Sequence, residues 1–491
     1  MDLRDHQARA IELVNDSIKK GNKNVMLAAP CSFGKTRVAV EMLANVANNG
    51  GRGLFICDRI KLVQQAVDEF DKHGIEAGVI QGWDHPRSNW RSSIQIASVQ
   101  TLARRKIWPM ANLVIIDEAH VHYKTHTRLM EEYSRAPFIG LSATPFAKGL
   151  GQHYQDLLVP ITASDLMGKG YLAPVKYYGG KKLDLKGVRT KKLPIGGYDY
   201  DPKALAERMD DDKGLAGDII KNWLRHGCNS QTIAFSPSIA HSKTLVEMFN
   251  NAGIPAEHID GYMDDSERQI LFREHDEGRF KILSCSRLLN TGYDAPSVRC
   301  LIDAFPTKSI TQWVQRVGRV LRLHESKEFA IVLDHAGNVN KLGFAEDVVP
   351  SELDMSDKDY SERNQVKEKK EPKTMDCPMC YQIMMAPRCA CGYELPIAER
   401  LKTDDQILRE IEREADKKVH DLQVYWMNGF LAFARQRNYK PGWAGYKFKD
   451  KFGFWPTERV QRPASKLVKT VTPEIANYLT HLNIRRAKSA A

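Results

Sequence analysis

The first 145 residues alternate short apolar runs with amphipathic segments. The apolar runs are VMLAA, GLFICD, IQIAS, LVIID and PFIGLS. The segments between them, such as KTRVAVEMLANVA and RIKLVQQAVDEFDKHG, place apolar residues at helical spacing. Buried strands that alternate with helices are typical of a parallel sheet covered on both faces. We therefore expect an α/β domain over residues 1–160.

The same pattern restarts near residue 215, where TIAFS, FKILSCS, VRCLIDAF and FAIVLDH read as strands. This repetition predicts a second α/β domain over residues 161–350, joined to the first by the Gly- and Lys-rich stretch around residues 168–200. Residues 351–375 are charged and poor in apolar side chains, which predicts a linker. Residues 397–491 begin with a helical pattern, one long helix or two shorter ones within 404–437, and end in a basic, aromatic region.

Composition narrows the classes of protein. The 491 residues are 42% hydrophobic and 27% charged, which suits several globular domains. The sequence has no apolar run of about 18 residues, and its N-terminus, MDLRDHQARAIE, is charged where a signal peptide is apolar. We therefore expect no membrane span and a cytoplasmic location.

The net charge of +11 is concentrated near the C-terminal end. The last 91 residues hold 18 Lys and Arg against 10 Asp and Glu, a balance of +8. A basic end on a nearly neutral body predicts a polyanionic partner, although a solvated basic tail would look the same.

Four of the nine cysteines fall within fifteen residues, in CPMCYQIMMAPRCACGYE. Cys377 and Cys380 form one pair, and Cys389 and Cys391 form the second. Four thiolates in two close pairs suit tetrahedral Zn²⁺ and predict a zinc module over 376–396. Two disulfides or an iron–sulfur cluster are the alternatives. The other five cysteines are scattered through apolar or strand-like stretches, as buried thiols in a reducing compartment usually are.

The stretch LAAPCSFGKTR, residues 27–37, reads as a phosphate-binding loop between a strand and a helix. Lys35 would reach the β and γ phosphates, and the Thr36 hydroxyl would bind Mg²⁺. Ala29 stands where the usual pattern has its first glycine, and an ordinary backbone conformation there would make this variation tolerable. The predicted nucleotide-binding residues of the loop are Ala29, Pro30, Cys31, Ser32, Phe33, Gly34, Lys35 and Thr36.

The second half of the predicted site is LVIIDEAH, residues 113–120. Four apolar residues predict a buried strand, and its end presents two acids. Asp117 can hold Mg²⁺, while Glu118 can polarise the water that attacks the γ-phosphate. A strand that ends in two acids could by itself be structural or a Mg²⁺ site of another kind. A lysine loop followed by this strand predicts ATP or a similar nucleotide, with Mg²⁺.

These motifs belong to a longer series that resembles the superfamily 2 helicases. LRDHQ (3–7), CDRIKLVQQ (57–65), ASVQTL (97–102), DEAH (117–120) and SATP (142–145) occur in family order, followed by AFSPSIAHSKTL, LLNTGYDAP and QWVQRVGRVLR. The resemblance implies two tandem RecA-like domains that hydrolyse ATP. It also implies that Gln7 faces the adenine base and that Gly292 and Asp294 couple to the nucleotide. The residues that would link hydrolysis to nucleic acid are Arg59, Gln100, Thr101, His120, Ser142, Thr144 and Thr291.

The last motif carries the predicted catalytic residues of the second domain, which are Gln315, Arg316, Arg319 and Arg322. A guanidinium from the opposite domain would stabilise the charge that develops during phosphoryl transfer. A basic helical face is the plain alternative. For His120, we expect a hydrogen bond to the glutamine of this motif.

Further stretches resemble the branch that contains RadD, a bacterial DNA-repair protein, and phage-encoded helicases share the same plan. They are LAPVKYY, GYDYDPKALAERMDDDKGLAGDIIKNW, LDHAGNVNKLG, the cysteine cluster and the ending GW…YKFKDKFGFWP. This resemblance implies single-stranded or branched DNA as the substrate and single-strand binding protein as a possible partner.

The C-terminal stretch interleaves aromatic residues with lysines, which suits contact with a single strand. The same aromatics could instead form a small core under the preceding helix. The residues are Tyr439, Trp443, Tyr446, Phe448, Phe452, Phe454 and Trp455, with Lys440, Lys447, Lys449 and Lys451.

Together these features predict an ATP-dependent DNA helicase or translocase that acts in replication, recombination or repair. An RNA helicase with the same motor is one alternative, because motor contacts run along the backbone. A DNA-binding or annealing factor that ATP merely switches is another. The motor subunit of a restriction enzyme is the third, and it would need a nuclease motif or partner.

Overall fold

The computed structural model describes most of the two predicted α/β domains and part of the C-terminal region. The described residues are 3–82, 85–179, 185–193, 198–210, 215–286, 293, 295–356, 374–376, 383–385, 409–411, 414–440, 442–452, 455–456, 460–461, 464, 471–472, 474–476 and 478–479. Two compact units divide the chain, Met1–Glu410 and Ile411–Ala491.

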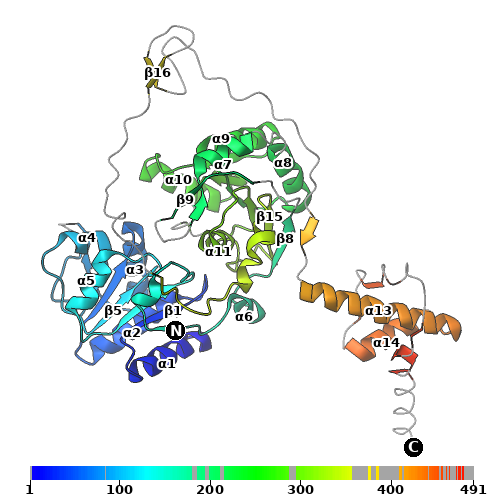
Figure 1. Cartoon of the computed structure of the whole chain (residues 1–491), viewed down its shortest axis with the longest axis horizontal. Helices are drawn as coiled ribbons and strands as arrows, with labels where there is room; N and C mark the ends of the chain where they lie inside the picture. The colour runs from blue at the N-terminus through cyan, green and yellow to red at the C-terminus, as the bar shows by residue number, and fades with distance from the viewer. Residues whose placement is uncertain are drawn as a thin grey trace, which may run out of the picture. The chain divides into compact units, whose positions relative to one another are not determined.

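The first domain is a parallel sheet with the strand order β3-β4-β2-β5-β6-β1-β7. Helices flank it (Figure 1). Its elements are α1 (Asp5–Lys19), β1 (Asn24–Ala28), α2 (Lys35–Asn48), β2 (Gly53–Cys57), α3 (Ile60–Lys72), β3 (Gly78–Ile80), β4 (Ile94–Ser98), α4 (Val99–Arg104), β5 (Leu113–Ile116), α5 (Lys124–Glu132), β6 (Phe138–Ser142), η1 (Leu150–Gln152) and β7 (Asp156–Leu158).

The central strands explain why this sheet forms. Every residue of β2, β4, β5 and β6 is buried, so both faces of the sheet are covered. Their alternate side chains pack into a core that includes Leu54, Ile56, Val114, Ile116 and Phe138. The five predicted strands of this domain are all present, while the short edge strands β3 and β7 carry little sequence signal.

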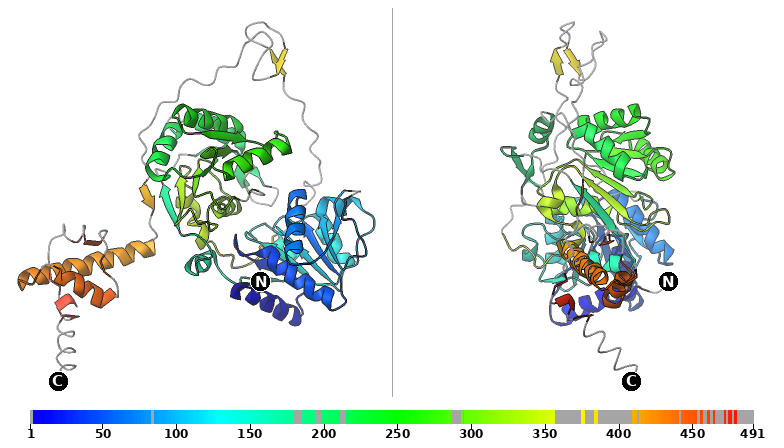
Figure 2. Two further views of the ribbon diagram at one scale, coloured as in Figure 1. Left: turned by 180° about the vertical axis from the view of Figure 1, so that it is seen from behind. Right: turned by 90° about the vertical axis from the view of Figure 1, so that its right-hand side faces the viewer.

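The second domain repeats the plan with the order β12-β13-β11-β14-β15-β8-β18. Figure 2 shows its helices against the sheet. After α6 (Ala163–Gly168), its elements are β8 (Val175–Gly179), β9 (Thr190–Lys192), β10 (Tyr198–Tyr200), α7 (Pro202–Asp210), α8 (Leu215–His226), β11 (Thr232–Phe235), α9 (Ile239–Asn251), β12 (Ala256–Ile259), α10 (Asp265–Asp276), β13 (Ile282–Cys285), β14 (Cys300–Asp303), α11 (Ile310–Gly318), β15 (Ala330–Asp334), α12 (Asn338–Leu342), η3 (Ala345–Asp347) and β18 (Arg409–Ile411).

The predicted connection around residues 168–200 contains three strands. β8 pairs in parallel with β15 inside the sheet, from Val175 opposite Ala330 to Gly179 opposite Asp334. β9 and β10 form a separate antiparallel hairpin. The stretch that joins the domains thus contributes strands to the second domain, because sheet pairing supplies order that the Gly- and Lys-rich composition does not reveal.

The start of the predicted linker at 351–375 packs against the first domain. Leu353 contacts the core of that domain. The Asp354 carboxylate accepts a hydrogen bond from the Gly149 backbone N–H at 2.9 Å, and its carbonyl accepts one from Gly151 N–H at 2.9 Å. The chain thus returns from the second domain to the first, which corrects the linker prediction for residues 351–356. Residues 357–373 lie outside the described part.

The C-terminal unit contains α13 (Glu414–Gln436) and α14 (Trp443–Phe452). α13 is one helix, whereas Arg409–Ile411, at the start of the predicted helical pattern, is the strand β18. Phe430, Phe448 and Ile475 are fully buried in the core of this unit.

Two more short strands, β16 (Thr374–Asp376) and β17 (Ile383–Met385), pair antiparallel with each other.

None of the helices in the described residues is long and apolar enough to cross a membrane. Among the cysteines of these residues, Cys57, Cys285 and Cys300 are buried, as expected, but Cys31 is half-buried and Cys228 is exposed.

Candidate nucleotide site

The loop between β1 and α2 has the backbone of a phosphate cradle. Ser32 and Gly34 have positive φ angles of 62° and 86°, whereas Ala29 is not among the residues with positive φ. The Ala29 N–H donates to the Ser142 carbonyl at 2.8 Å, which joins the ends of β1 and β6. An alanine therefore fits where the usual pattern has glycine. Lys35 and Thr36 open α2, where the helix N-terminus favours an anion.

Gln7 on α1 holds this loop from the side. Its Nε2 donates to the Phe33 carbonyl at 3.0 Å, and its Oε1 accepts from the Arg4 N–H at 3.0 Å. A Cβ atom at Gly34 would lie 2.3 Å from Gln7 Nε2, so this close approach requires glycine at 34. Gln7 is thus placed beside the nucleotide loop, and contact with adenine stays a prediction.

The two acids follow β5 at the carboxyl edge of the sheet. Burial raises the pKa of Asp117 to about 6, and the adjacent Glu118 carboxylate contributes to the rise, whereas Lys35 lowers it. Burial is the largest single influence on Glu118 and acts to raise its pKa. The Lys35 charge, the hydrogen bond and charge of His120 and the Arg319 charge together outweigh burial, so the pKa lies below its usual value.

These groups fit a cation. Asp117 Oδ1 is buried, and the described residues provide it with no hydrogen-bond partner. A carboxylate oxygen is a ligand that Mg²⁺ prefers, and Thr36 begins the helix that follows the phosphate loop. Asp117 and Thr36 are therefore the residues that would hold Mg²⁺, whose charge would offset that of the phosphates.

His120 contacts residues of its own domain. Its Nδ1 lies 2.9 Å from Ser142 Oγ and 3.2 Å from Glu118 Oε2. The Ser142 hydroxyl also accepts from the Thr144 N–H at 3.0 Å, so the DEAH and SATP motifs form one network. The structure therefore pairs His120 with Ser142 and Glu118, and not with Gln315 as expected.

The end of α11 reaches the nucleotide loop from the second domain. A Cβ at Gly318 would lie 2.5 Å from Cys31 Sγ, so the helix packs tightly against the loop. The next residue, Arg319, lowers the pKa of Glu118, and its Nη1 donates to the Tyr293 carbonyl at 2.8 Å. Burial lowers the pKa of Arg322, and proximity to Cys31 partly offsets this. Gln315 is half-buried on the same helix.

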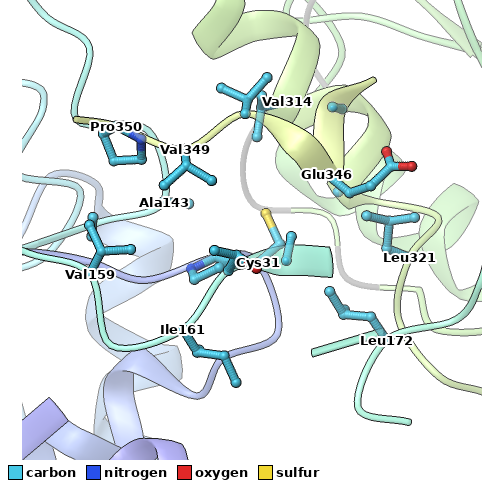
Figure 3. A pocket seen from close by; sticks show the side chains of 17 residues that line it. Cys31, Ala143, Val159, Ile161, Leu172, Val314, Leu321, Glu346, Val349 and Pro350 are labelled. Atoms are coloured by element: carbon cyan, nitrogen blue, oxygen red, sulfur yellow. The ribbon is translucent and has the colours of Figure 1, made fainter. Parts of the chain in front are cut away.

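A small apolar cavity lies beside this contact (Figure 3). Pro30 and Cys31 line it from the first domain, Val314 and Leu321 line it from the second, and residues 348–350 close it. Its volume of about 40 Å³ has room for a few water molecules and no nucleotide. The cavity shows that the two domains and the returning segment pack together beside the phosphate loop.

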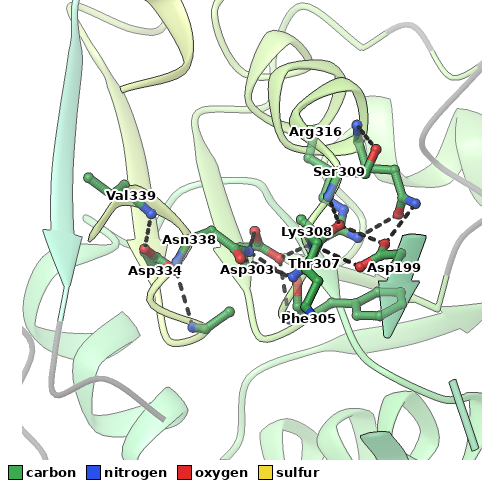
Figure 4. A network of polar contacts seen from close by, with 12 residues as sticks. Asp199, Asp303, Phe305, Thr307, Lys308, Ser309, Arg316, Asp334, Asn338 and Val339 are labelled. Carbon is green, nitrogen blue, oxygen red and sulfur yellow. Dashed lines mark hydrogen bonds and ion pairs between the residues drawn. The ribbon is translucent and has the colours of Figure 1, made fainter. Parts of the chain in front are cut away.

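Arg316 points away from the phosphate loop into the second domain. Its Nη1 donates to Asp303 Oδ1 at 3.0 Å and to the Phe305 carbonyl at 2.6 Å, and its Nη2 donates to Gln312 Oε1 at 3.0 Å (Figure 4). Its side chain is fully buried. The structure therefore does not bring Arg316 to the nucleotide site together with Arg319. The contacts of Arg316 instead suit the role of a positioning residue.

The predicted nucleic-acid loops lie at the carboxyl ends of β2 and β4. Gln100 Nε2 donates to the Asp58 carbonyl, next to the exposed Arg59. Thr101 Oγ1 accepts from the Gly82 N–H at 3.1 Å. Neighbouring parallel strands end at one edge, so these loops are brought together at the edge where α/β sheets bind ligands.

Two groups of predicted residues lie outside the described residues. They are Thr291, Gly292 and Asp294, and the zinc-ligand candidates Cys377, Cys380, Cys389 and Cys391. Within the part of the chain that the structure describes, no cluster of three or more His, Cys, Asp or Glu could hold a metal ion.

Two protein families match the chain, one in each domain. Residues 1–147 match the family described as "Type III restriction enzyme, res subunit", and residues 216–324 match "Helicase conserved C-terminal domain". A protein of a Lactococcus phage (isolate 7-9), described as "51.5 kDa protein", is 26% identical over 386 residues, covering 76% of this chain and 79% of its own length. "ATP-dependent DNA helicase uvsW" of Enterobacteria phage T4 is 24% identical over 340 residues, covering 65% of this chain and 66% of the phage protein.

The chain belongs to the superfamily 2 helicases. The predicted enzyme class, a nucleic-acid helicase that hydrolyses ATP, is confirmed with it. The helicase spans only part of some relatives. "Putative ATP-dependent helicase IRC3" of Saccharomyces cerevisiae is 26% identical over 360 residues, covering 68% of this chain and 51% of the yeast protein.

The predicted fold of this helicase, two tandem parallel-sheet domains, is also confirmed. A putative HsdR subunit of a type I restriction enzyme from Vibrio vulnificus has the same fold, with a TM-score of 0.55 at 20% identity. The match covers 72% of this chain and 66% of that structure.

Sequence reasoning missed the network around Arg316 in the helicase. Asp199, Asp303 and Asp334 are buried carboxylates that hold the loops and helices at the carboxyl edge of the second sheet (Figure 4). The available signal was an acid directly after each apolar strand, in CLID and AIVLD. Asp199 lies in a short hairpin strand and gives no such signal.

Proposed function

We propose that the protein is an ATP-dependent DNA helicase or translocase. The observation that carries this proposal is the contact of α11 with the phosphate loop, which places Arg319 of one domain near Glu118 of the other. Such a site depends on how the two domains sit against each other. The T4 relative, named as an ATP-dependent DNA helicase, supports DNA as the substrate.

Each residue of the site has one task in this mechanism. Lys35 neutralises the β and γ phosphates, Glu118 orients and polarises the attacking water, and Arg319 stabilises charge on the transferred group. Mg²⁺ at Asp117 and Thr36 would add positive charge to the same phosphates. ATP favours the closed arrangement of the domains and hydrolysis relaxes it, so alternate closure and opening moves the protein along a strand.

Steady-state ATP hydrolysis tests the proposal. The wild type is assayed without nucleic acid and with single-stranded, duplex, forked or four-way DNA, and with RNA. We expect strong stimulation by at least one form of DNA. Stimulation by RNA alone would make the protein an RNA helicase. A rate that no nucleic acid changes would favour the ATP-switched annealing factor.

We also propose, from the sequence resemblance, that the protein belongs to the RadD-like branch and acts in replication, recombination or repair. Single-strand binding protein is the expected partner. A pull-down with tagged protein tests this pairing, and a lack of enrichment of single-strand binding protein would contradict it.

Zinc is part of the proposal on the cysteine pattern alone. Cys377, Cys380, Cys389 and Cys391 form a complete tetrahedral donor set, which leaves no open coordination position for catalysis. Metal analysis of the purified protein should give about one Zn²⁺ per chain. The Cys377→Ser/Cys380→Ser variant should lose it.

The C-terminal unit is proposed to bind single strands. Phe448 is fully buried, so part of the aromatic set forms the small core that the alternative predicted. Tyr446 and Trp455 remain 63% and 49% exposed and contact each other edge-to-face, with Lys449 over the Trp455 ring. Exposed aromatic faces beside a lysine suit base stacking. Alanine at both positions should weaken single-strand binding.

A second candidate is the motor subunit of a restriction enzyme. The match of residues 1–147 and the similarity to the HsdR structure favour it. This candidate requires a partner that cleaves or methylates DNA. Co-purification from the native host distinguishes it, since a helicase acting alone brings down no such partner.

A further inference from the structure

The hairpin of β9 and β10 presents a basic, aromatic surface. In the described residues 185–193 and 198–200, the side chains of Arg189, Lys191, Lys192 and Tyr198 are exposed, and Tyr198 is 60% exposed. Lys192 lies opposite Tyr198 in the pairing of the two strands, so a cation and an aromatic ring share one face. Asp199 is the one acid in these two segments, and its side chain is buried.

Two more lysines extend this surface at the base of the hairpin. The ammonium groups of Lys308 and Lys341 lie 4.8 Å and 4.7 Å from the centre of the Tyr200 ring. Both lysines are exposed. The Lys341 ammonium also donates to the Tyr200 hydroxyl at 3.2 Å. The hairpin and its base thus form a positive surface at the carboxyl edge of the second sheet, since residue 308 follows β14.

Asp199 fastens the hairpin to the sheet (Figure 4). Its carboxylate accepts hydrogen bonds from the Thr307 hydroxyl at 2.7 Å, the Lys308 N–H at 2.7 Å and Gln312 Nε2 at 3.1 Å. It also accepts from the Tyr200 N–H at 2.8 Å. A buried carboxylate with four donors is stable, and here it lies at the N-terminus of α11, where the helix dipole favours a negative charge.

The same helix carries the catalytic arginine. Gln312, in the first turn of α11, binds Asp199 with its Nε2 and Arg316 with its Oε1. Arg316 is locked to Asp303, and Arg319 follows three residues later at the phosphate loop. Hydrogen bonds therefore connect the exposed hairpin to the helix that completes the nucleotide site.

We propose that the β9–β10 hairpin contacts the phosphate backbone of the DNA strand, and that Asp199 is the positioning residue that couples this contact to Arg319. The inference rests on the proposed function. Charge complementarity selects the occupant, because clustered Lys and Arg beside an exposed ring suit a single-stranded polyanion. A strand held at the hairpin pulls on α11 through Asp199 and so changes the position of Arg319.

The binding half is tested with Lys191→Gln/Lys192→Gln against the control Lys19→Gln/Lys20→Gln. The control removes the same charge from exposed positions at the end of α1. Single-stranded DNA affinity is measured by fluorescence anisotropy at several salt concentrations. We expect the hairpin variant to bind about tenfold more weakly at low salt, with a salt slope smaller by about two, whereas the control changes less than about twofold.

The outcomes separate the two claims. If the wild type binds DNA and the hairpin variant binds as the control does, the inference is wrong and the proposed function stands. If the wild type binds no DNA, the proposed function fails and takes the inference with it.

The coupling half is tested with Asp199→Asn, which keeps the shape but removes the charge. The readout is the ratio of the DNA-stimulated kcat to the kcat without DNA, which we expect to fall about fivefold. The control is Asp201→Asn, because the Asp201 carboxylate accepts from the Lys203 and Ala204 N–H groups at the start of α7 rather than from the N-terminus of α11. An equal fall of both rates, which leaves the ratio unchanged, would show a merely structural role and overturn the coupling.

Discussion

The carboxyl edges of the two sheets are built in opposite ways. At the edge of the first sheet, buried oxygens of Ser32, Asp117 and Thr144 have no hydrogen-bond partner among the described residues. At the edge of the second, both oxygens of Asp199, Asp303 and Asp334 accept hydrogen bonds from protein groups.

This difference indicates a division of labour. Buried polar groups without partners are costly, and they persist where a ligand supplies the missing contacts. Buried carboxylates whose oxygens all accept hydrogen bonds instead hold a helix in one position. In the proposed mechanism, the first domain therefore receives the nucleotide, and the second positions the arginine that completes the site.

The largest combined loss, of ATP hydrolysis and nucleotide binding together, is expected at the receiving edge. Lys35→Ala removes the cation whose charge lowers the pKa of both site acids, so ATP hydrolysis should fall by about 10²-fold or more and nucleotide binding should weaken with it. Hydrolysis and binding of a fluorescent ATP analogue are measured together. The control Lys19→Ala, on the exposed surface of α1, should match the wild type. Normal nucleotide binding by Lys35→Ala would contradict the proposal that the carboxyl edge of the first sheet binds the nucleotide.

A smaller effect is expected at the positioning edge. Arg316→Met leaves the buried Asp303 carboxylate without its cation, which should lower the free energy of unfolding by about 3–5 kcal/mol. Denaturant unfolding measures this loss. Nucleotide binding should persist, because the Arg316 guanidinium is bound to Asp303 and the Phe305 carbonyl inside the second domain. The double variant Arg316→Met/Asp303→Asn should recover part of the stability, and a lack of recovery would contradict the pairing.

The smallest effect concerns pH. Burial raises the pKa of Asp334 to about 7, and Asp303 contributes to the rise. The folded state thus keeps a proton that the unfolded chain releases above pH 4, so the free energy of unfolding decreases as pH rises toward 7 and beyond. Between pH 6 and 8 the decrease is about 1 kcal/mol, or a few degrees in Tm.

Asp334→Asn removes this titration. Thermal melts of the wild type and the variant at pH 6 and pH 8 measure the difference. The wild type should lose more thermal stability at pH 8 than the variant does. An equal loss in both would show that Asp334 does not titrate in this range.

Much of this comparison could be read from the sequence. Continuous apolar runs predicted the strands that are buried on both faces, because such strands need no alternation. The strand β8, which lies between β15 and β18 and has one fully buried side chain, was not predicted, because VKYYG lies in a Gly- and Lys-rich context. The receiving edge was also predictable, since Lys35 and Asp117 occupy motifs whose residue types follow from the chemistry of phosphate and Mg²⁺ binding.

The positioning edge was not predictable in the same way. Arg316 and Arg319 lie three residues apart in one motif, yet one is buried with Asp303 and the other reaches the phosphate loop. The spacing of the two arginines in the sequence does not reveal which of them pairs with a buried acid. The partner of Gln312 is Asp199, more than a hundred residues away, and only the folded structure joins them.

The most direct test of the division of labour is the Arg319→Ala variant, with Arg225→Ala on the exposed end of α8 as the control. Affinity for a slowly hydrolysed ATP analogue and the kcat for ATP are measured on the same preparations. The account predicts affinity within about threefold of the wild type and a kcat lower by about 10³-fold. An unchanged kcat, or a loss explained entirely by weaker nucleotide binding, would contradict it.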